Sequence, residues 1–310
     1  LNLDTNEPTD IDIMVEGDSI KFARELANLL NVKNIVEYSE FKTALIPYEK
    51  FEIEVASSRS ETYSSDSRKP AVSEATFNDD LSRRDFTVNA IAASINKDSF
   101  GELHDPYGGI RDLQKGLLIT PLDPDATFID DPLRMLRAIR FATQLDFKIA
   151  PNAIESISRN KKRIEIISWE RITNEIIKIL STNTPSTGFY LLRDTGLLEI
   201  ILPEFSIMGG VEKKNNLSHK DVFIHTLQVI DNAAKLSPKM EIRFAALVHD
   251  IAKPQTKQFI EGKGWAYHGH EIVGINLMKK LSKRMKLSNE LTNYLCKLIK
   301  LHLRPIALAK

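Results

Sequence analysis

Behind the turn-rich stretch at residues 105–109, apolar residues recur over a long stretch at the three- and four-residue spacing of helices. In front of it, short β-like runs at residues 11–15, 43–47 and 51–56 surround one amphipathic segment at residues 19–30. A change of period within one chain restricts the architecture, because strands and helices bury their apolar residues in different geometries. The pattern predicts an α+β fold, with a small mixed sheet in front and helices behind.

The length of 310 residues exceeds what one hydrophobic core usually supports, so we expect several domains. Proline- and glycine-rich breaks at residues 121–124 and 208–210 mark loops between them. We therefore place a head at residues 1–120, a helical neck at residues 121–207 and a helical C-terminal domain at residues 208–310.

One segment of the head, residues 57–80, is rich in Ser, Glu, Asp, Arg and Pro and poor in apolar residues. This composition is typical of a mobile surface loop. We expect it to interrupt the head without ending it.

Composition excludes several classes of protein. The single cysteine, Cys296, cannot form an internal disulfide, so a reducing cytoplasm is the expected location. No apolar run approaches the roughly 20 residues that span a bilayer, so no membrane partner is expected. The net charge is zero, but residues 1–80 hold 17 acidic against 8 basic side chains, and residues 279–310 hold 9 basic side chains and one acidic. This asymmetry favours cations in front and a phosphate backbone behind, although solvated helix faces would also produce it.

Two carboxylates open the first apolar run. In an extended strand Asp10 and Asp12 point to one face, and Glu52 and Glu54 share a face of a later strand in the same way. Neighbouring acids repel unless a cation neutralises them, and Mg²⁺ prefers oxygen ligands and phosphates. Three such acids can hold two divalent ions for phosphoryl transfer. An acidic edge strand would give the same pattern.

Three longer strings follow in order. They are Arg-Arg-Asp-Phe-Thr-Val-Asn-Ala at residues 83–90, Asp-Pro-Tyr-Gly-Gly-Ile-Arg-Asp-Leu at 105–113 and Asp-Asp-Pro-Leu-Arg-Met-Leu-Arg-Ala-Ile-Arg-Phe at 130–141. Behind the paired acids, these strings resemble those of bacterial-type CCA-adding tRNA nucleotidyltransferases and poly(A) polymerases. The resemblance extends over essentially the whole chain. It implies a nucleotidyltransferase head and a helical neck that reads the base and binds RNA.

The resemblance also implies roles for single residues. Mg²⁺ would bind Asp10 and Asp12, and Glu54 is the best match to the third catalytic acid. Contacts to the ribose and phosphates of the nucleotide would come from the string at residues 83–90, through Arg83, Arg84, Asp85 and Asn89.

The third string has a physical reading of its own. Asp131, Arg134 and Arg137 follow at three-residue steps, so on one helix they would crowd the same side. In the resembling family this helix selects the incoming base through an acid and an arginine, whose planar groups match a base edge. A surface ladder of ion pairs fits the spacing equally well. The family usually has Glu where this chain has Asp130, which leaves the role of Asp130 open.

Arg171 and Glu175 lie four residues apart on a predicted helix at residues 169–180. Their place resembles the last short motif of the family. We expect a structural salt bridge, with Arg171 available to brace the base-reading helix.

Histidines gather in the C-terminal domain, where five of the seven lie within residues 225–302. Buried imidazole and carboxylate groups need partners, and a divalent metal would satisfy both. His225, His249 and Asp250, with Lys253 and the string His268-Gly269-His270, resemble the HD-type metal phosphohydrolases that are fused to some CCA-adding enzymes. We therefore predict a divalent metal at His225, His249 and Asp250. No final aspartate ligand of that family is identifiable, so the domain is expected to be incomplete at its C-terminal end.

The family also carries a Gly-Gly-x-Val-Arg-Asp string just before the paired acids, and this chain has none. We therefore expect the head to be N-terminally incomplete, with weakened nucleotide binding in the chain as given.

These observations predict Mg²⁺-dependent addition of CMP and AMP, from CTP and ATP, to the 3′ end of tRNA, with release of pyrophosphate. The nearest alternatives add only the terminal A or make poly(A). The loop at residues 59–80 argues against an enzyme that adds only CC, because in the resembling family such enzymes lack a full loop between the acids and the string at residues 83–90. Two further alternatives are a metal phosphohydrolase with an RNA-binding front half and an inactive RNA-binding protein. The oligomeric state cannot be predicted.

Overall fold

The computed structural model describes residues 10–62, 71–74, 76–304 and 308. Contacts divide the chain into two compact units. Unit 1 extends to Arg111 and includes Thr120–Leu122, and unit 2 holds Asp112–Ile119 and the chain from Asp123 onward. Each unit is described by itself below.

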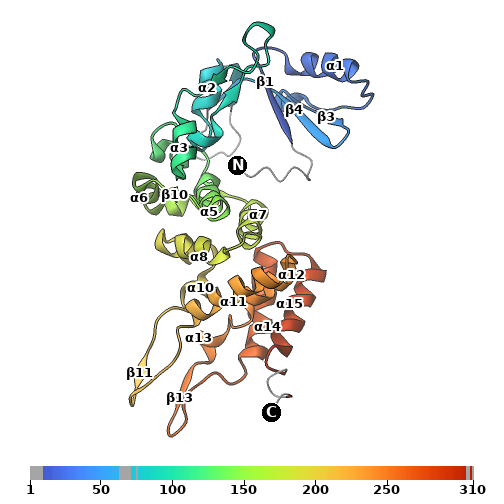
Figure 1. Ribbon diagram of the computed structural model, residues 1–310. Coiled ribbons are helices and arrows are strands. Elements are labelled where there is room, and N and C mark those ends of the chain that lie inside the picture. Colours follow the sequence, from blue (N-terminus) through green and yellow to red (C-terminus); the bar gives the residue numbers. More distant parts are fainter. Residues whose placement is uncertain (1–9, 63–70, 75, 305–307, 309–310) are drawn as a thin grey trace. The chain divides into compact units, whose positions relative to one another are not determined.

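A four-stranded sheet in the order β1-β4-β3-β2 makes up the first part of unit 1, together with α1 (Figure 1). The bounds are β1 Ile11–Val15, β2 Val36–Tyr38, β3 Thr43–Tyr48 and β4 Phe51–Ser57. β1 runs parallel to β4, whereas β3 is antiparallel to both β4 and β2. The strands predicted at residues 11–15, 43–47 and 51–56 are thus confirmed. The parallel pairing of β1 with β4 places two segments that are distant in the sequence side by side, with their ends at the same edge.

Helix α1, Ser19–Leu29, covers one face of this sheet and confirms the helix predicted at residues 19–30. The side chain of Asp18 accepts from the backbone N–H of Lys21 and so caps the first turn. Ala23 and Ala27 are buried against Ile46 and Val55. One face of the sheet packs on α1. Because side chains alternate along a strand, every second residue points to the other face, which α1 does not cover.

The segment at residues 57–80 is not a plain loop. Residues Arg59–Thr62 (β5) pair antiparallel with Ala71–Glu74 (β6), and Phe77–Ser82 forms helix α2 behind a capping box at Thr76. Residues 63–70 and 75, on which the loop prediction also falls, lie outside the described residues. A two-stranded ribbon needs no continuous apolar face, so its composition resembled that of a loop.

The rest of unit 1 leads through short elements to α3. These are η2 Thr87–Asn89, β7 Ala92–Ala93, η3 Lys97–Ser99, β8 Leu103–His104 and α3 Gly109–Lys115, with the short η1 Ser39–Phe41 lying earlier in the chain. The carboxylate of Asp105 accepts from the backbone N–H groups of Gly109 and Ile110, at 2.6 and 3.0 Å. Gly109 lies so close to Thr87 that an added Cβ would come within 2.1 Å of the Thr87 carbonyl oxygen. The string at residues 105–113 therefore makes a tight turn into α3.

Unit 2 begins with packed helices. They are α4 Pro124–Asp130, α5 Leu133–Leu145, α6 Pro151–Asn160, η4 Lys161–Ile166, α7 Trp169–Leu180, α8 Pro185–Asp194, α9 Leu197–Ile201 and α10 Pro203–Ser206, with a small parallel pair β9 Leu117–Leu118 and β10 Lys148–Ile149. Ile139 on α5 and Ile176 on α7 are fully buried. The helix predicted at residues 169–180 is confirmed.

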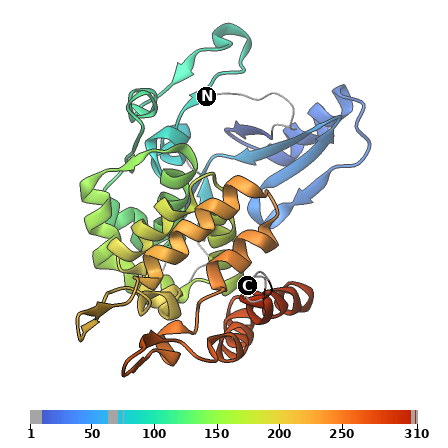
Figure 2. The same ribbon diagram turned by 60° about the horizontal axis from the view of Figure 1, so that its bottom comes forward.

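The following elements are α11 Val222–Leu236, α12 Met240–Val248, α13 Lys253–Thr256, α14 His270–Arg284 and α15 Asn289–Leu301. Two hairpins interrupt them: β11 Lys213–Lys214 with β12 Leu217–Ser218, and β13 Gln258–Ile260 with β14 Gly264–Ala266. Both hairpins project from the helices and lie side by side in Figures 1 and 2. The sequence pattern predicted helices alone here, because strands of two and three residues are too short to show a period.

Among the described residues, no helix combines the length and the apolar character that a bilayer crossing requires.

Candidate functional site

The acids of the sheet lie on the face that α1 leaves open. Asp12 on β1 is the register partner of Glu54 on β4, and both residues are exposed. Partners in adjacent strands point to the same side, so these two carboxylates lie side by side. Among the described residues neither is paired with a cationic side chain, so a hard divalent cation suits the oxygen ligands that they offer.

Asp10 precedes β1 and is exposed. Asp10, Asp12 and Glu54 do not offer three ligand atoms within 4.8 Å of one another. Two other groups of three residues in the described part of the chain do. The structure thus brings two of the predicted acids into register and leaves the third at the start of the strand.

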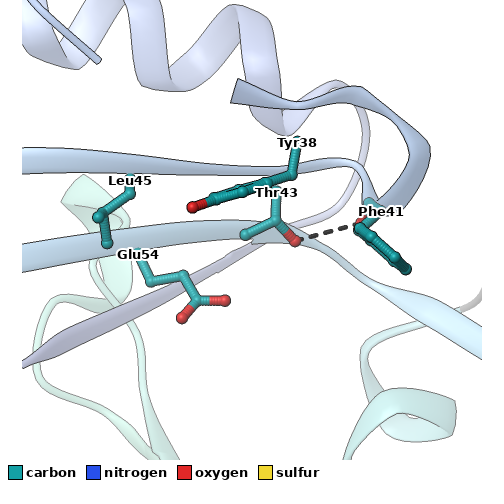
Figure 3. Close-up of a pocket in the computed structure, with 5 residues that line it drawn as sticks. All are labelled: Tyr38, Phe41, Thr43, Leu45 and Glu54. Atoms are coloured by element: carbon teal, nitrogen blue, oxygen red, sulfur yellow. Dashed lines mark hydrogen bonds between the residues drawn. The ribbon is translucent and has the colours of Figure 1, made fainter. Parts of the chain in front are cut away.

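A pocket of about 320 Å³ adjoins Glu54 on the same sheet (Figure 3). Its other lining residues come from β2, η1 and β3, namely Tyr38, Phe41, Thr43 and Leu45. Tyr38 and Phe41 are about half exposed, at 48% and 54%. The Thr43 hydroxyl donates to the Phe41 carbonyl, at 3.2 Å, and ties the end of the pocket to β3. Exposed aromatic rings beside an acid were not anticipated from the sequence.

The arginines of the string at residues 83–90 share one buried acid. Asp80 is 1% exposed, and Arg83 and Arg84 bind its two carboxylate oxygens. Asp85 is also buried; its carboxylate accepts from Phe86 N–H and from the side-chain amide of Asn89. The string therefore holds its own turn together, and Asn89 remains exposed at its end.

Asp131 does not lie on the same helix as Arg134 and Arg137, so the prediction of one crowded helix face was wrong at this residue. α4 ends at Asp130, Asp131 is extended, and α5 begins at Leu133. Pro132 explains the break, because a residue before proline is driven out of the helical region. The carboxylate of Asp131 instead accepts from Leu133 N–H, at 3.1 Å, at the start of α5. Arg134 and Arg137 lie on α5.

Arg171 and Glu175 have different partners, and the structure contains no direct salt bridge between them. Arg171 Nη2 donates to Asp131 Oδ2 at 3.1 Å, whereas Glu175 Oε2 lies 2.7 Å from Arg140 Nε. Arg171 therefore braces Asp131, the residue before Pro132 and α5. The buried Glu175 joins α7 to α5.

Asp250 is the centre of a second site, the His–Asp cluster of His225, His249, Asp250, His270 and His302. The Nε2 atoms of His225 and His249 lie 3.6 and 3.0 Å from Asp250 Oδ2. Those of His270 and His302 lie 3.5 and 3.6 Å from Oδ1. Two groups of three ligand atoms, which share Asp250, each lie within 4.8 Å. Two imidazoles on helices α11 and α14 and two at the ends of α12 and α15 thus converge on one carboxylate that is 1% exposed.

Hydrogen bonds fix the tautomer of three of these histidines. The Nδ1 atoms of His249, His270 and His302 lie 2.7 to 2.8 Å from backbone carbonyl oxygens. A carbonyl only accepts, so each Nδ1 carries the hydrogen. Nε2 of each ring then faces Asp250 as a lone pair when the ring is neutral and as an N–H donor when the ring is protonated. Such lone pairs repel a carboxylate and one another, and the Nε2 atoms of His270 and His302 are 3.2 Å apart. A cation among them removes this repulsion, so the residues fit a divalent metal.

This arrangement shifts the pKa values of several groups in the cluster. Burial opposes ionisation of Asp250, but the surrounding imidazoles of His249, His270 and His302 outweigh it and hold its pKa well below the usual range. The hydrogen bond to Asp250 raises the pKa of His270, and burial lowers that of His225. Asp250 Oδ1 is buried without a hydrogen bond, whereas Oδ2 accepts from Lys253 Nζ at 2.6 Å.

The predicted metal ligands His225, His249 and Asp250 do come together. His302, which the sequence showed only as one of several clustered histidines, takes a place in the same site beside His270. His268 is exposed and belongs to neither group of ligand atoms. The signal that could have identified His302 is its position at the end of a helix, since α15 ends one residue before it.

Three family models match this chain. They are the poly A polymerase head domain at residues 2–119, the "probable RNA and SrmB-binding site of polymerase A" at residues 146–208, and the HD domain at residues 222–309.

Curated relatives agree with the models. The multifunctional CCA protein of Nitrosospira multiformis is 36% identical over 248 residues, which is 76% of this chain and 57% of the relative. That of Psychromonas ingrahamii is 38% identical over 228 residues, which is 71% of this chain and 53% of the relative. The chain thus spans little more than half the length of these relatives.

Solved structures share the fold. A CCA-adding enzyme in complex with ATP has a TM-score of 0.66 at 25% identity, over 96% of this chain and 63% of that one. The Thermotoga maritima CCA-adding enzyme complexed with tRNA also has a TM-score of 0.66, at 24% identity, over 96% of this chain and 63% of that one. With its head, RNA-binding and HD models in this order, the chain belongs to the family of poly(A) polymerases and CCA-adding tRNA nucleotidyltransferases that carry an HD domain.

Proposed function

We propose that the protein adds CMP and AMP, from CTP and ATP, to the 3′ end of tRNA without a template and releases pyrophosphate. The observation that carries the proposal is the register of Asp12 with Glu54 on the open face of a head that the poly A polymerase model matches. The relatives named multifunctional CCA proteins support tRNA as the substrate. The proposal also divides the protein into a head, a neck and a C-terminal domain, with boundaries near residues 120 and 207. It places the protein in the cytoplasm.

Catalysis would then rest on positioning and charge. Asp12 and Glu54 would hold Mg²⁺ together with Asp10, which directly precedes β1. The chemistry that Mg²⁺ supplies is activation of the attacking 3′ hydroxyl and neutralisation of the departing pyrophosphate. The protein's share is to align the hydroxyl with the α-phosphate of the nucleotide.

Nucleotide recognition is proposed for two sets of residues. Arg134 and Arg137 on α5, with Asp131 before it, would choose the base through paired donors and acceptors. The string at residues 83–90 would contact ribose and phosphates. Arg83 and Arg84 already bind Asp80, in front of the string, and Asp85 accepts from Asn89, so these bonds would position the string for the nucleotide.

The test is incorporation of labelled CTP and ATP into tRNA lacking its CCA end, by a full-length version of the protein with Mg²⁺. Asp12→Asn and Glu54→Gln should each reduce incorporation at least about a hundredfold, since each removes a ligand charge at the reacting centre. Glu52→Gln is the matched control, because Glu52 is exposed on the same face of β4 two residues away. Full activity of both site variants would refute the assignment. Addition of A alone to tRNA ending in CC would identify an enzyme that adds only the terminal A. Synthesis of a long A tail would identify a poly(A) polymerase.

A second function is proposed for the His–Asp cluster, on the observation that four imidazoles converge on the buried Asp250. We propose metal-dependent hydrolysis of phosphoesters. The chemistry that a divalent ion supplies at such a site is polarisation of a phosphoryl oxygen and activation of water. Lys253 would hold Asp250 in place through its 2.6 Å contact.

The second proposal is tested first by metal binding. Mn²⁺ or Zn²⁺ titrated into metal-free protein should bind and raise the melting temperature. His302→Ala should weaken binding by about tenfold or more, whereas His268→Ala, an exposed histidine outside the cluster, should not. Hydrolysis of bis-p-nitrophenyl phosphate should disappear with a chelator. Absence of metal binding would refute this function and leave the transferase proposal untouched.

A further inference from the structure

A row of side chains crosses the sheet of unit 1 from β1 over β4 to β3. Asp12 on β1 is the register partner of Glu54 on β4, which is in turn paired with Leu45 on β3. The pocket of about 320 Å³ begins at Glu54 and extends over β3 to β2, where Tyr38 lines it (Figure 3). It therefore lies on the side of Glu54 that faces away from Asp12, directly beside the two proposed Mg²⁺ ligands.

The lining of this pocket is aromatic and, apart from Glu54, uncharged. The rings of Tyr38 and Phe41 are about half exposed, and Thr43 and Leu45 complete the lining. Among the described residues that line the pocket there is no lysine, arginine or histidine. A triphosphate needs cationic partners, so this lining suits a neutral, flat group such as a nucleoside. The volume is near the lower limit of small-molecule sites, which fits one nucleoside.

Hydrogen bonds of the neighbouring backbone hold Phe41 in place. The next residue, Lys42, has a left-handed conformation, with φ 47°, and its N–H donates to the Ser39 carbonyl. The Lys42 carbonyl accepts from the Ser19 hydroxyl at 2.6 Å and from the Ser57 N–H at 3.1 Å. The turn that carries Phe41 is thereby tied to the start of α1 and to the end of β4. An aromatic surface that needs no rearrangement is suited to stacking with a base.

The position of the pocket beside the acids indicates which nucleoside it takes. In the proposed reaction two nucleosides meet at Asp12 and Glu54, namely that of the incoming nucleotide and the 3′-terminal one of the RNA. The incoming nucleotide carries a triphosphate, for which the pocket lining offers no cation, and its base is assigned to Arg134 and Arg137. The terminal nucleoside of the RNA reacts through a neutral hydroxyl. Glu54, at the edge of the pocket, is one of the acids that would hold the ion that activates this hydroxyl.

We infer that this pocket holds the 3′-terminal nucleoside of the RNA, with its base against the rings of Tyr38 and Phe41 and its 3′ hydroxyl toward Glu54. Each addition makes a new terminus, so an enzyme that adds C, C and A must accept different terminal bases in turn. Stacking tolerates every base because each has a π-face, whereas a pocket that reads a base edge would select one. The inference rests on the proposed transferase function, and it adds a binding site for the second substrate.

A fluorescent base tests this contact without catalysis. The probe is a tRNA acceptor minihelix whose 3′-terminal nucleotide carries 2-aminopurine, a base whose fluorescence is quenched by stacking. Binding to a full-length version of the protein, without CTP or ATP, should quench it saturably. Tyr38→Leu with Phe41→Leu removes both rings but keeps apolar side chains, and should abolish most of the quenching and weaken binding about tenfold. Tyr38→Phe with Phe41→Tyr keeps both rings and should retain the quenching.

Two controls show whether the effect belongs to the pocket. Phe100→Ala removes a ring that is 79% exposed and lies outside the pocket lining, so it should leave the quenching unchanged. With 2-aminopurine in the duplex part of the minihelix, the signal should not depend on Tyr38 or Phe41. Equal quenching of the terminal base with and without the two rings would overturn the inference.

Steady-state kinetics separate the RNA end from the incoming nucleotide. In Tyr38→Leu with Phe41→Leu, the KM for tRNA ending in C or CC should rise about tenfold or more, while the KM values for CTP and ATP stay within about twofold. The melting temperature should stay close to that of the parent, because both rings are already about half exposed. A rise confined to the KM values for CTP and ATP would assign the pocket to the incoming nucleotide and overturn the inference.

The pocket and the transferase function fail in different ways. If the protein incorporates nucleotides but neither the quenching nor the KM for tRNA depends on Tyr38 and Phe41, the pocket assignment is wrong and the transferase stands. If it incorporates none but the two rings still quench the terminal 2-aminopurine, the transferase proposal is wrong and the pocket stands as a site for an RNA end.

Discussion

Arg171 Nη2 lies 3.1 Å from Asp131 Oδ2, across 40 residues of sequence. The other carboxylate oxygen of Asp131 accepts from Leu133 N–H at the start of α5. One side chain thus joins α7 to the first turn of the helix that carries Arg134 and Arg137. The proposed base-reading residue is held from two sides, and its orientation depends on a neighbour that would not itself touch the nucleotide.

Arg171→Ala should therefore alter nucleotide choice more than stability. The pair is partly exposed, at 46% for Arg171 and 20% for Asp131, so its loss should cost less than about 1 kcal/mol. The freed Asp131 should lower the discrimination between CTP and ATP, measured as the ratio of their kcat/KM values on tRNA ending in CC. Arg159→Ala breaks the exposed pair with Asp125 and should leave this ratio unchanged. An unaltered ratio in Arg171→Ala would show that the brace has no role in selection.

Glu175→Gln should destabilise unit 2. Arg140 and Glu175 are buried, and their Nε and Oε2 atoms are 2.7 Å apart. Breaking a buried ion pair by neutralising one member typically costs roughly 3–5 kcal/mol. Urea unfolding measures the change, with Glu170→Gln in the exposed first turn of the same helix as a control expected within about 0.5 kcal/mol. A loss below about 1 kcal/mol would mean that water or another group replaces the pair.

Gly109→Ala should disrupt the turn that begins α3. A Cβ there would come within 2.1 Å of the Thr87 carbonyl oxygen and 2.9 Å of an Ile91 side-chain atom. Backbone must move to relieve this clash, so we expect a loss of about 3 kcal/mol or aggregation on expression. At Gly209 the nearest atom would be 3.9 Å away, which makes Gly209→Ala the matched control. Equal melting temperatures for the two variants would contradict the packing argument.

Asp125 should contribute to acid unfolding. The hydrogen bond from Ser156, then that from Arg159 and a weaker one from Asn160, lower its pKa from the ordinary value. A lowered folded-state pKa adds stability above the unfolded-state pKa, and that stability is lost as the pH falls through the folded value. Asp125→Asn should therefore be less stable than the parent at pH 7, and the gap should narrow below about pH 4. Urea midpoints between pH 7 and pH 3 measure the gap; the exposed Asp98→Asn should show none, and a gap independent of pH in Asp125→Asn would exclude the charge as its cause.

Sequence periodicity was sufficient to predict the strands and the helix that have long apolar faces. β1, β3, β4 and α1 were predicted within two residues at either end, because each buries one regular face against the others. The strings at residues 83–90, 105–113 and 130–141 were sufficient for the family, since their residue types are specific to a shared chemistry. The clustering of the histidines, the adjacent His249-Asp250 and the resemblance to HD-type phosphohydrolases together predicted a metal site at His225, His249 and Asp250.

Other features depend on contacts between residues that are far apart in the sequence, so no local sequence pattern predicts them. Nothing in the spacing shows that Glu175 pairs with Arg140 rather than Arg171, because both choices lie within reach of a helix surface. The two short hairpins lack a period, yet they bring Trp265 to Leu217 and build a pocket beside His225. His302 joins the cluster only because α15 packs so that its end faces Asp250. The sequence by itself determined which residues can do the chemistry, and tertiary packing decided which of them meet.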